Sequence, residues 1–358
     1  MSITPRAGLG VFEGYHSAQV QAKVRLNTNE SPFPPPPELL SRWQEKVVEL
    51  SLNRYPDRSA DALRSAIAKF HKVSQDMVFV ANGSNEVIQT ILLSFGTSGA
   101  RAVSFEPTYA MYETIARVTN TSYSALERLE DFSISTQTLA SDLKDLNPSV
   151  TFVCAPNNPT GIAEDSTTID LLGSEAPGLV VIDEAYGQFS PISQVGRTLK
   201  FDNIAVVRTF SKIWSLAGMR IGYCIAPPPI VDILWKVALP YHLDSSKQLL
   251  ATLCFDYVAE MEERVAFLVS QRIQLELALG ELGIQYWPSS ANFILFRPKG
   301  VDAADLWRRL LDKGVLIRDW SKWPRLANCL RVTVGTQSEN DYFLEALTHS
   351  LNEMSASW

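Results

Sequence analysis

The chain has 358 residues, of which 46% are hydrophobic and 20% are charged, and its formal net charge is -7 at pH 7. These values are ordinary for a globular enzyme with a sizeable core, and the length allows two or three domains. The acidic balance and the lack of a long basic block argue against nucleic acid as a partner. Neither a window of about eighteen apolar residues nor a secretory leader is visible, so we expect no membrane partner and a cytoplasmic location.

Cysteine and histidine form no recognisable metal or disulfide pattern in the sequence. There are 4 residues of each type, scattered along the chain without CxxC spacing. We therefore expect reduced thiols, no metal site and no catalytic triad built on histidine.

Residues 1–37 are expected to form an N-terminal arm outside the core. The end of this segment, NESPFPPPP, is rich in proline, which forbids helix and favours an extended polyproline conformation. Helical spacing begins at Glu38, and the turn RYPD at residues 54–57 separates two predicted helices. Tyr55 in that turn is either a packing aromatic or a side chain that reaches a ligand across a subunit interface.

From residue 78 onward, short apolar runs alternate with helix-like or connecting stretches. The runs occupy residues 78–81, 102–105, 150–155, 178–183 and 204–207. This alternation predicts an α/β fold with a mostly parallel, doubly wound sheet, which we assign to a large domain over residues 38–229. Ligands bind beyond the carboxyl ends of such strands, so functional residues are expected directly after each run.

The run at 204–207 is followed by a cluster of polar and basic residues, which includes Thr209, Ser211, Lys212 and Arg220. A lysine beside other cations loses its proton more readily, and only the neutral amine attacks a carbonyl. Lys212 is therefore predicted to form a Schiff base, while the neighbouring hydroxyls and Arg220 would hold a phosphate. An aldehyde combined with a phosphate describes pyridoxal phosphate. A solvated basic loop after a strand is the plainer interpretation of the same residues.

The first two runs end in residues that suit the same cofactor. Gly83, Ser84 and Asn85 lead into a helical stretch, whose N-terminus would offer N–H groups to a phosphate. Tyr109 follows the second run and would stack on a planar ring at the same edge of the sheet. A plain helix cap and a core tyrosine are the alternative interpretations.

The next two runs end in an amide, a carboxylate and a phenol. Asn157 lies in a turn fixed by prolines, where its amide would bond a ring hydroxyl or simply serve the turn. A carboxylate that emerges from a buried strand needs a partner, and Asp183 would hold the pyridine nitrogen of the cofactor protonated. Tyr186 would bond the ring hydroxyl together with Asn157.

The parallel pattern ends near residues 227–229, after which long helical stretches and strand-like runs predict a smaller α+β domain over residues 230–358. Arg318 and Arg331 each lie inside a strand-like run of this part. Each arginine is either half of a structural salt bridge or a bidentate contact for an anionic substrate.

Ordered motifs extend over nearly the whole chain: LNTNESPF, RYPD, NGSNE, EPTY, APNNPTG, DEAY, RTFSKIWSLAGMRIGY, NFILF, RDW and LRVTVGT. In this order they resemble the fold-type I, class II pyridoxal-phosphate aminotransferases, and among them the histidinol-phosphate aminotransferases. The resemblance implies that Lys212 carries the Schiff base and that Asp183 pairs with the pyridinium. It also implies that Tyr186 and Asn157 bond the ring hydroxyl. Finally, it implies that Tyr55 reaches the cofactor phosphate of the neighbouring subunit, in a homodimer with shared active sites.

The same resemblance assigns residues to the substrate. The side chains expected there are Tyr15, Asn29, Arg318 and Arg331. Asn85 is a departure, because many members of the family carry an acid at this place in the turn. The change should matter little if the turn binds the cofactor through backbone N–H groups.

The implied reaction is reversible transfer of an amino group between L-histidinol phosphate and 2-oxoglutarate in a two-stage cycle. Two rivals share the lysine site, namely an aminotransferase for aromatic amino acids and a phosphothreonine decarboxylase. A third rival is a transcription regulator that uses the same fold as an effector sensor. We disfavour the regulator because no basic DNA-binding domain precedes the arm.

Overall fold

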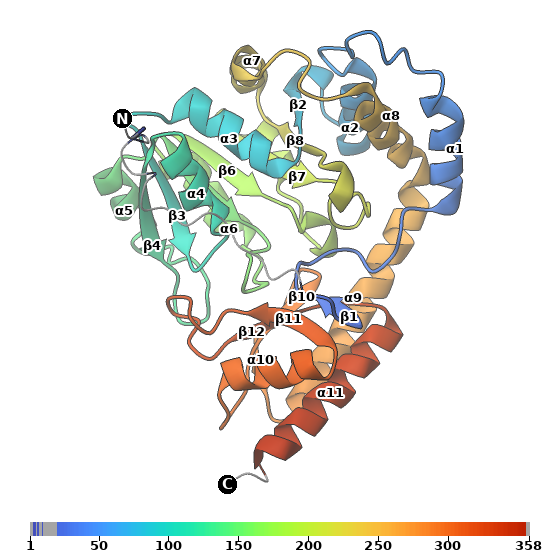
Figure 1. The fold of residues 1–358 in the computed structure, drawn as a ribbon. Coiled ribbons are helices and arrows are strands. Elements are labelled where there is room, and N and C mark those ends of the chain that lie inside the picture. The colour runs from blue at the N-terminus through green and yellow to red at the C-terminus, as the bar shows by residue number, and fades with distance from the viewer. Residues whose placement is uncertain (1–2, 5, 7–8, 10–19, 356–358) are drawn as a thin grey trace.

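The computed structural model describes residues 3, 4, 6, 9 and 20–355 (Figure 1). The helices are α1 (Pro37–Val47), α2 (Asp61–His71), α3 (Ser84–Phe95), α4 (Met111–Val118), α5 (Leu139–Leu146), α6 (Ser166–Glu175), α7 (Pro228–Val237), α8 (Ser245–Cys254), α9 (Val258–Glu281), α10 (Ala303–Asp312) and α11 (Gln337–Ser355). Short 3-10 helices occur at Gln75–Met77, Gly187–Phe189, Val195–Leu199, Ala217–Met219 and Phe255–Tyr257.

The large sheet has seven strands in the order β2-β8-β7-β6-β5-β3-β4. These strands are β2 (Val78–Ala81), β3 (Arg101–Glu106), β4 (Ser122–Glu127), β5 (Val150–Cys154), β6 (Leu179–Asp183), β7 (Ile204–Thr209) and β8 (Gly222–Ile225). Strand β8 is antiparallel to β2 and β7, and the other neighbours are parallel. The predicted mostly parallel α/β sheet is therefore confirmed, and each of the five predicted runs forms a strand.

Side chains of successive strand residues point to opposite faces of the sheet. Both faces of this sheet therefore carry apolar side chains, and helices cover both. On one face, Val181 belongs to a core that includes residues of α3, α4 and α7. On the other face, Val180 and Ile182 belong to a core that includes residues of α2, α5, α6 and α8. Every residue of β5, β6 and β7 is buried, as apolar runs in a doubly wound sheet require.

A second sheet of five strands, in the order β1-β11-β12-β10-β9, lies beside α9, α10 and α11 (Figure 1). Its strands are β1 (Val24–Leu26), β9 (Gln285–Tyr286), β10 (Phe293–Arg297), β11 (Val315–Asp319) and β12 (Leu330–Thr333). Strand β1 comes from the segment that we expected to remain outside the core. It pairs in parallel with β11, and Val24 and Leu26 are buried. The prediction for this part of the arm was wrong, because its alternate apolar residues complete the edge of the small sheet.

The helices α7 and α8 also differ from the prediction, which placed the start of the small domain at residue 230. Helix α7 packs on α3 and β2, and α8 packs on α1 and α2. Val231 and Leu234 in α7 are buried in a core of the large sheet, and Leu250 in α8 is buried in a core that includes residues of α2. We therefore propose that the boundary lies near the start of α9, which runs from the large sheet along the small one (Figure 1). Among the described residues, no helix is long and apolar enough to cross a membrane.

Candidate active site

A cavity of about 350 Å³ lies where the carboxyl ends of β5, β6 and β7 face strands β11 and β12 of the small sheet. Parallel strands bring their carboxyl ends to one edge, which explains why residues far apart in sequence meet here. The predicted site residues that line the cavity are Asn29, Ser84, Asn85, Tyr109, Asp183, Tyr186, Thr209, Ser211, Lys212, Arg220, Arg318 and Arg331.

Lys212 lies in the loop after β7, and its Nζ donates a hydrogen bond of 3.1 Å to the Thr28 carbonyl. The Nζ atom also lies 5.4 Å from the centre of the Tyr186 ring. Burial, and next the positive charge of Arg331, lower the pKa of Lys212 from 10.5 to about 7. The charged form is disfavoured because it loses hydration and faces another cation. Near neutral pH a substantial fraction of this lysine is therefore a neutral amine, the form that attacks a carbonyl carbon.

Asp183 is the last residue of β6, and only 2% of its surface is exposed. Its Oδ2 accepts a hydrogen bond of 2.9 Å from the Tyr112 hydroxyl, and its Oδ1 accepts one of 3.0 Å from the Ala185 N–H. Burial raises the pKa of Asp183 to about 6, although the Tyr112 hydrogen bond acts in the opposite direction. A buried carboxylate of this kind is stabilised by a cationic partner, which a protonated ring nitrogen would supply.

Tyr186 stands three residues after Asp183, and its hydroxyl is the meeting point of two asparagine amides. Asn29 Nδ2 lies 3.0 Å from this oxygen and Asn158 Nδ2 lies 3.4 Å from it. Burial raises the pKa of the Tyr186 phenol, so it remains protonated at neutral pH. It can therefore donate its own proton to a ligand while it accepts from the amides.

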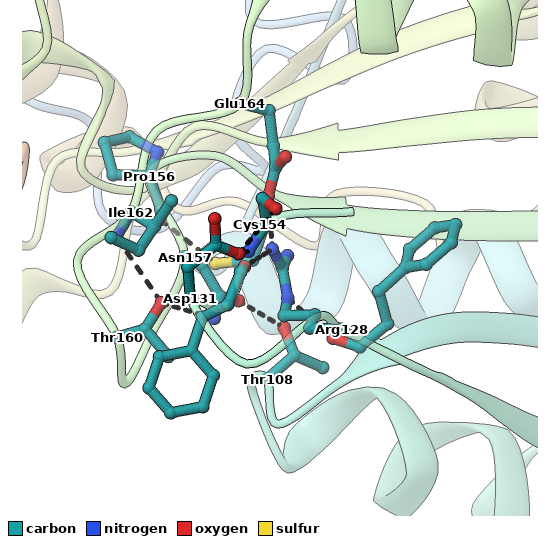
Figure 2. A network of polar contacts seen from close by, with 12 residues as sticks. Thr108, Arg128, Asp131, Cys154, Pro156, Asn157, Thr160, Ile162 and Glu164 are labelled. Atoms are coloured by element: carbon teal, nitrogen blue, oxygen red, sulfur yellow. Dashed lines mark hydrogen bonds and ion pairs between the residues drawn. The ribbon is translucent and has the colours of Figure 1, made fainter. Parts of the chain in front are cut away.

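The structure corrects the assignment of Asn157, because Asn158 and not Asn157 lines the cavity. The carboxamide of Asn157 is instead bonded within the protein, to the Thr108 and Thr160 hydroxyls (Figure 2). It also donates to the Pro107 carbonyl. The contact to a ring hydroxyl that we expected from Asn157 is therefore available from its neighbour.

The phosphate corner combines a helix N-terminus, two hydroxyls and a guanidinium. Helix α3 begins at Ser84, and Arg220 Nη1 donates a hydrogen bond of 3.2 Å to Ser211 Oγ, which also accepts one of 3.0 Å from Thr209 Oγ1. Gly83 has a φ of +88°, and a Cβ at this position would lie 2.7 Å from Arg220 Nη2. Gly83 does not line the cavity itself, but the missing side chain lets the guanidinium approach the start of the helix. This donor set suits a phosphate dianion.

Next to this corner, Tyr109 donates a hydrogen bond of 3.1 Å to Asn85 Oδ1, and both residues line the cavity. The Asn85 side chain thus orients the tyrosine ring at the cavity wall. An acid at this position would offer the same acceptor, so the departure from the family pattern preserves the contact.

Arg318 and Arg331 occupy directly opposite positions on the antiparallel strands β11 and β12. Arg331 is 5% exposed, and it donates to the Asn27 carbonyl at 2.9 Å and to the Asn158 Oδ1. The ring of Trp320 packs against both arginines, with its centre 5.7 Å from each guanidinium carbon. Like charges at opposite positions of a strand pair repel each other, so an anion held between them would be stabilising.

Besides Gly83 and Asn157, one other described residue that we predicted for the site, Tyr55, does not line the cavity. Tyr55 is 80% exposed and stacks on Tyr241, with ring centres 4.5 Å apart, at the surface of the same chain. Tyr15 lies outside the described residues. A role for either side chain stays a prediction.

Several lining residues were not predicted from the sequence. They are Asn27, Thr28, Ala110, Thr114, Cys154, Asn158, Ala185, Trp320 and Trp323. Asn158 is adjacent to the predicted amide in the same turn, so a prediction for the whole turn would have included it. Asn27 and Thr28 directly follow β1 and lie in the motif LNTNESPF, which contributed to the family resemblance, although only Asn29 of that motif was assigned to the site. Trp320 and Trp323 lie shortly after Arg318 in the sequence. Two aromatic residues so close to a candidate anion-binding arginine were the signal that could have assigned them to the site.

Residues 21–347 match the family model described as aminotransferase class I and II. The match spans most of the chain, and the chain belongs to this family, whose cofactor is pyridoxal 5'-phosphate. The predicted cofactor is therefore confirmed, and the donors around the cavity fit its aldehyde, ring and phosphate.

Curated relatives identify the group within the family. A histidinol-phosphate aminotransferase from Thermobifida fusca is 42% identical, over 93% of this chain and 91% of that protein. Another from Corynebacterium efficiens is 39% identical, over 93% and 91% respectively. The solved histidinol-phosphate aminotransferase from Sinorhizobium meliloti, in complex with pyridoxal-5'-phosphate, has a TM-score of 0.86 at 22% identity, over 93% of this chain and 92% of that one. The predicted resemblance to the histidinol-phosphate aminotransferases is confirmed.

Proposed function

We propose that this chain transfers an amino group reversibly between L-histidinol phosphate and 2-oxoglutarate, giving imidazole acetol phosphate and L-glutamate. The observation that carries the proposal is a single cavity that holds Lys212 together with two arginines at opposite strand positions. The names of the relatives support the donor, and the family match supports the type of reaction.

Lys212 and Asp183 supply the proton chemistry in this proposal. When bound, pyridoxal phosphate supplies an aldehyde for an amine and a ring that withdraws electrons from the substrate carbon. Lys212 would hold the aldehyde carbon and would later move a proton to and from the substrate Cα, a role favoured by its pKa of about 7. Asp183 would keep the ring nitrogen protonated. An ion pair about 4 Å apart is worth roughly 4 kcal/mol at an effective dielectric of about 20, before desolvation.

Tyr186, Asn158 and Tyr109 would orient the ring, and the corner of Ser211 and Arg220 would hold its phosphate. Each of these side chains already has a hydrogen-bond partner in the protein. Such prior fixation lowers the entropy that is lost when a ligand binds. These side chains therefore bind and orient the cofactor, while Lys212 performs the proton transfer.

Arg318 and Arg331 would recognise the anionic groups of the two substrates. Histidinol phosphate carries a phosphate monoester where an amino acid carries a carboxylate, and glutamate must enter the same cavity in the second stage. Planar guanidinium groups can bond both anions in bidentate fashion, which a lysine cannot. Trp320 and Trp323 form an aromatic wall beside them, with ring centres 5.2 Å apart, and this wall suits a planar imidazole.

The test compares kcat/KM of the purified holoenzyme for L-histidinol phosphate, L-histidinol, L-histidine and L-phenylalanine, with 2-oxoglutarate as the acceptor. Histidinol is the matched control because it differs from the proposed donor only in the phosphate. We expect histidinol phosphate to be preferred over histidinol by about one to two decades, since each charge-assisted hydrogen bond is worth roughly 1.5 to 3 kcal/mol. Equal or better turnover of phenylalanine would instead identify an aminotransferase for aromatic amino acids.

We also propose a homodimer in which Tyr55 reaches the site of the partner. The support is a set of exposed apolar side chains near the Tyr55–Tyr241 pair in sequence: Val48, Leu52 and Leu239 are 80%, 82% and 76% exposed. Exposed apolar side chains are a common feature of protein interfaces.

Hybrid dimers test this arrangement. Tyr55→Phe should weaken cofactor retention, and mixing this variant with inactive Lys212→Ala should create one site with both defects and one site with neither. The mixture should then contain active sites with the cofactor affinity of the unmodified protein. Sites that all keep the weakened affinity after subunit exchange would mean that Tyr55 acts within its own chain.

A further inference from the structure

Asn157 is fully buried, with 0% of its surface exposed, and joins two turns of the large domain (Figure 2). Its Oδ1 accepts a hydrogen bond of 2.7 Å from the Thr108 hydroxyl. Its Nδ2 donates to the Thr160 hydroxyl at 2.9 Å and to the Pro107 carbonyl at 3.0 Å. The oxygen and the nitrogen of this carboxamide are thus both used to connect the turn after β3 to the turn after β5.

Each of the two turns delivers a side chain to the cavity. Tyr109 directly follows Thr108, and Asn158 directly follows Asn157. Asn158 in turn contacts the Tyr186 hydroxyl and accepts a hydrogen bond from Arg331 of the small sheet. A change in the spacing of the two turns would therefore move a ring wall and an amide relative to each other.

Other parts of the fold fix the outer sides of both turns. The Thr108 N–H donates a hydrogen bond of 2.8 Å to the Glu106 carboxylate. The Gly161 carbonyl accepts one of 2.8 Å from the Ser290 N–H, and a Cβ at Gly161 would lie 2.4 Å from Ser289 Oγ. Each turn has its own anchor, so the Asn157 carboxamide determines how the two are placed relative to each other rather than whether each one forms.

We propose that Asn157 is a positioning residue, which sets Tyr109 and Asn158 at the spacing that the cofactor ring requires without touching the ring itself. The proposal rests on the proposed cofactor site, and it is independent of the identity of the amino donor. It divides into two arms: the bonds to Thr108 and to the Pro107 carbonyl place Tyr109, and the bond to Thr160 places Asn158.

Two isosteric variants separate the arms, since valine keeps the shape of threonine and removes the hydroxyl. Thr108→Val should raise the Kd for pyridoxal phosphate about tenfold, because the stacking ring is less well placed. Thr160→Val should shift the absorbance maximum of the bound cofactor and lower kcat about tenfold, with a smaller change in Kd. Asn157→Ala should show both effects, and adding either valine to it should have little further effect.

The matched control is Thr151→Val, on strand β5, which leads into the same turn. Thr151 is 0% exposed, and its hydroxyl has no hydrogen-bond partner among the described residues. This variant removes a buried hydroxyl without removing a bond, so Kd, absorbance and kcat should remain unchanged. Thr108→Ser and Thr160→Ser restore the hydroxyl and should recover most of the lost function.

Melting temperatures measured on the same samples distinguish positioning from simple support of the fold. If the three variants of Asn157, Thr108 and Thr160 lower the melting temperature but match Thr151→Val in Kd, absorbance and kcat, Asn157 is a structural residue and the proposal is wrong. Kd and absorbance are measured without an amino donor. A failure of histidinol phosphate as substrate would therefore leave this result intact, and the two proposals can fail separately.

Discussion

The two halves of the cavity hold their polar groups in different ways. At the ends of the large-sheet strands, the Asp183 carboxylate is bonded to Tyr112 and the Ala185 N–H, and Ser211 is bonded to Thr209 and Arg220. On the small sheet, by contrast, Arg318 and Arg331 stand at opposite positions of β11 and β12. Arg331 is itself hydrogen-bonded to Asn27 and Asn158, so the difference is one of charge: the first half is a set of mutually satisfied groups, and the second half concentrates positive charge.

This difference matches the two tasks of an aminotransferase. A cofactor that remains bound through the cycle is best held by groups that are already fixed. Substrates that alternate between a phosphate and carboxylates are better met by two cations whose mutual repulsion is relieved by whichever anion arrives. The positive half also acts on the other, because the charge of Arg331 lowers the pKa of Lys212.

Removing the amine at the centre should produce the largest effect. Lys212→Ala should abolish nearly all turnover and all borohydride-stable attachment of the cofactor, since the neutral amine of this lysine is the proposed nucleophile. Reduction with borohydride followed by peptide mapping identifies the labelled residue in the unmodified protein. A label on another lysine would show that Lys212 is not the nucleophile.

Substitution of Asp183, in the large-sheet half of the cavity, should produce the next largest loss of activity. Asp183→Asn keeps the size of the side chain and its contact with Tyr112, but an amide does not hold a proton on the ring nitrogen. We expect cofactor to remain bound and kcat to fall by several decades, with a much smaller change in KM. Single-turnover rates at saturating donor check this, and rates equal to those of the unmodified protein would remove Asp183 from the mechanism.

Changes to the two arginines sharpen the contrast between the halves. Arg331→Lys should impair both stages of the cycle, and Arg318→Lys should lower kcat/KM for histidinol phosphate by about one to two decades, with a smaller penalty for histidinol. The absorbance of the bound cofactor should be preserved in Arg318→Lys, whereas Arg331→Lys also alters the bond to Asn158 Oδ1 and should shift the absorbance slightly. Equal penalties for the two donors would mean that Arg318 supports the fold rather than the phosphate.

The two halves also differ in how far the sequence predicted them. The large-sheet residues follow apolar runs, and parallel topology brings the ends of such runs together, so Asp183, Tyr186 and Lys212 could be assigned to one edge. The choice between Asn157 and Asn158 depends on the local path of a turn, which adjacent identical residues do not reveal. The sequence therefore indicated the correct turn and the wrong amide.

The small-sheet half depends on contacts between distant parts of the chain. Strand β1 has three residues and pairs with β11, and an apolar–polar alternation over only three residues is too short to distinguish a strand from a loop. Helical stretches were expected after residues 227–229, but a helical pattern carries no information about which of the two domains receives the buried faces of α7 and α8. Opposition of Arg318 to Arg331 likewise follows from strand register, which a single sequence does not specify.

The smallest predicted effect is a shift in the pH dependence of cofactor uptake. It tests whether Arg331, in the small-sheet half of the cavity, changes the pKa of Lys212 in the other half. Lys212 reacts only as the neutral amine, and its pKa is about 7 instead of 10.5, mainly because of burial and next because of Arg331. The rate at which apo-protein takes up pyridoxal phosphate should therefore rise as the pH is raised to about 7 and level off above it. Below that pH each unit should cost about tenfold.

Replacing Arg331 with glutamine removes one of the positive charges that disfavour the ammonium form, so the midpoint of this profile should move to higher pH while the plateau is still reached. A small model amine measured in parallel corrects for titration of the cofactor itself. A rise that continues toward pH 10 in the unmodified protein would mean that Lys212 keeps an ordinary pKa. An unchanged midpoint in Arg331→Gln would mean that burial and the other charges near Lys212 set the value, and that Arg331 does not act electrostatically on the other half of the cavity.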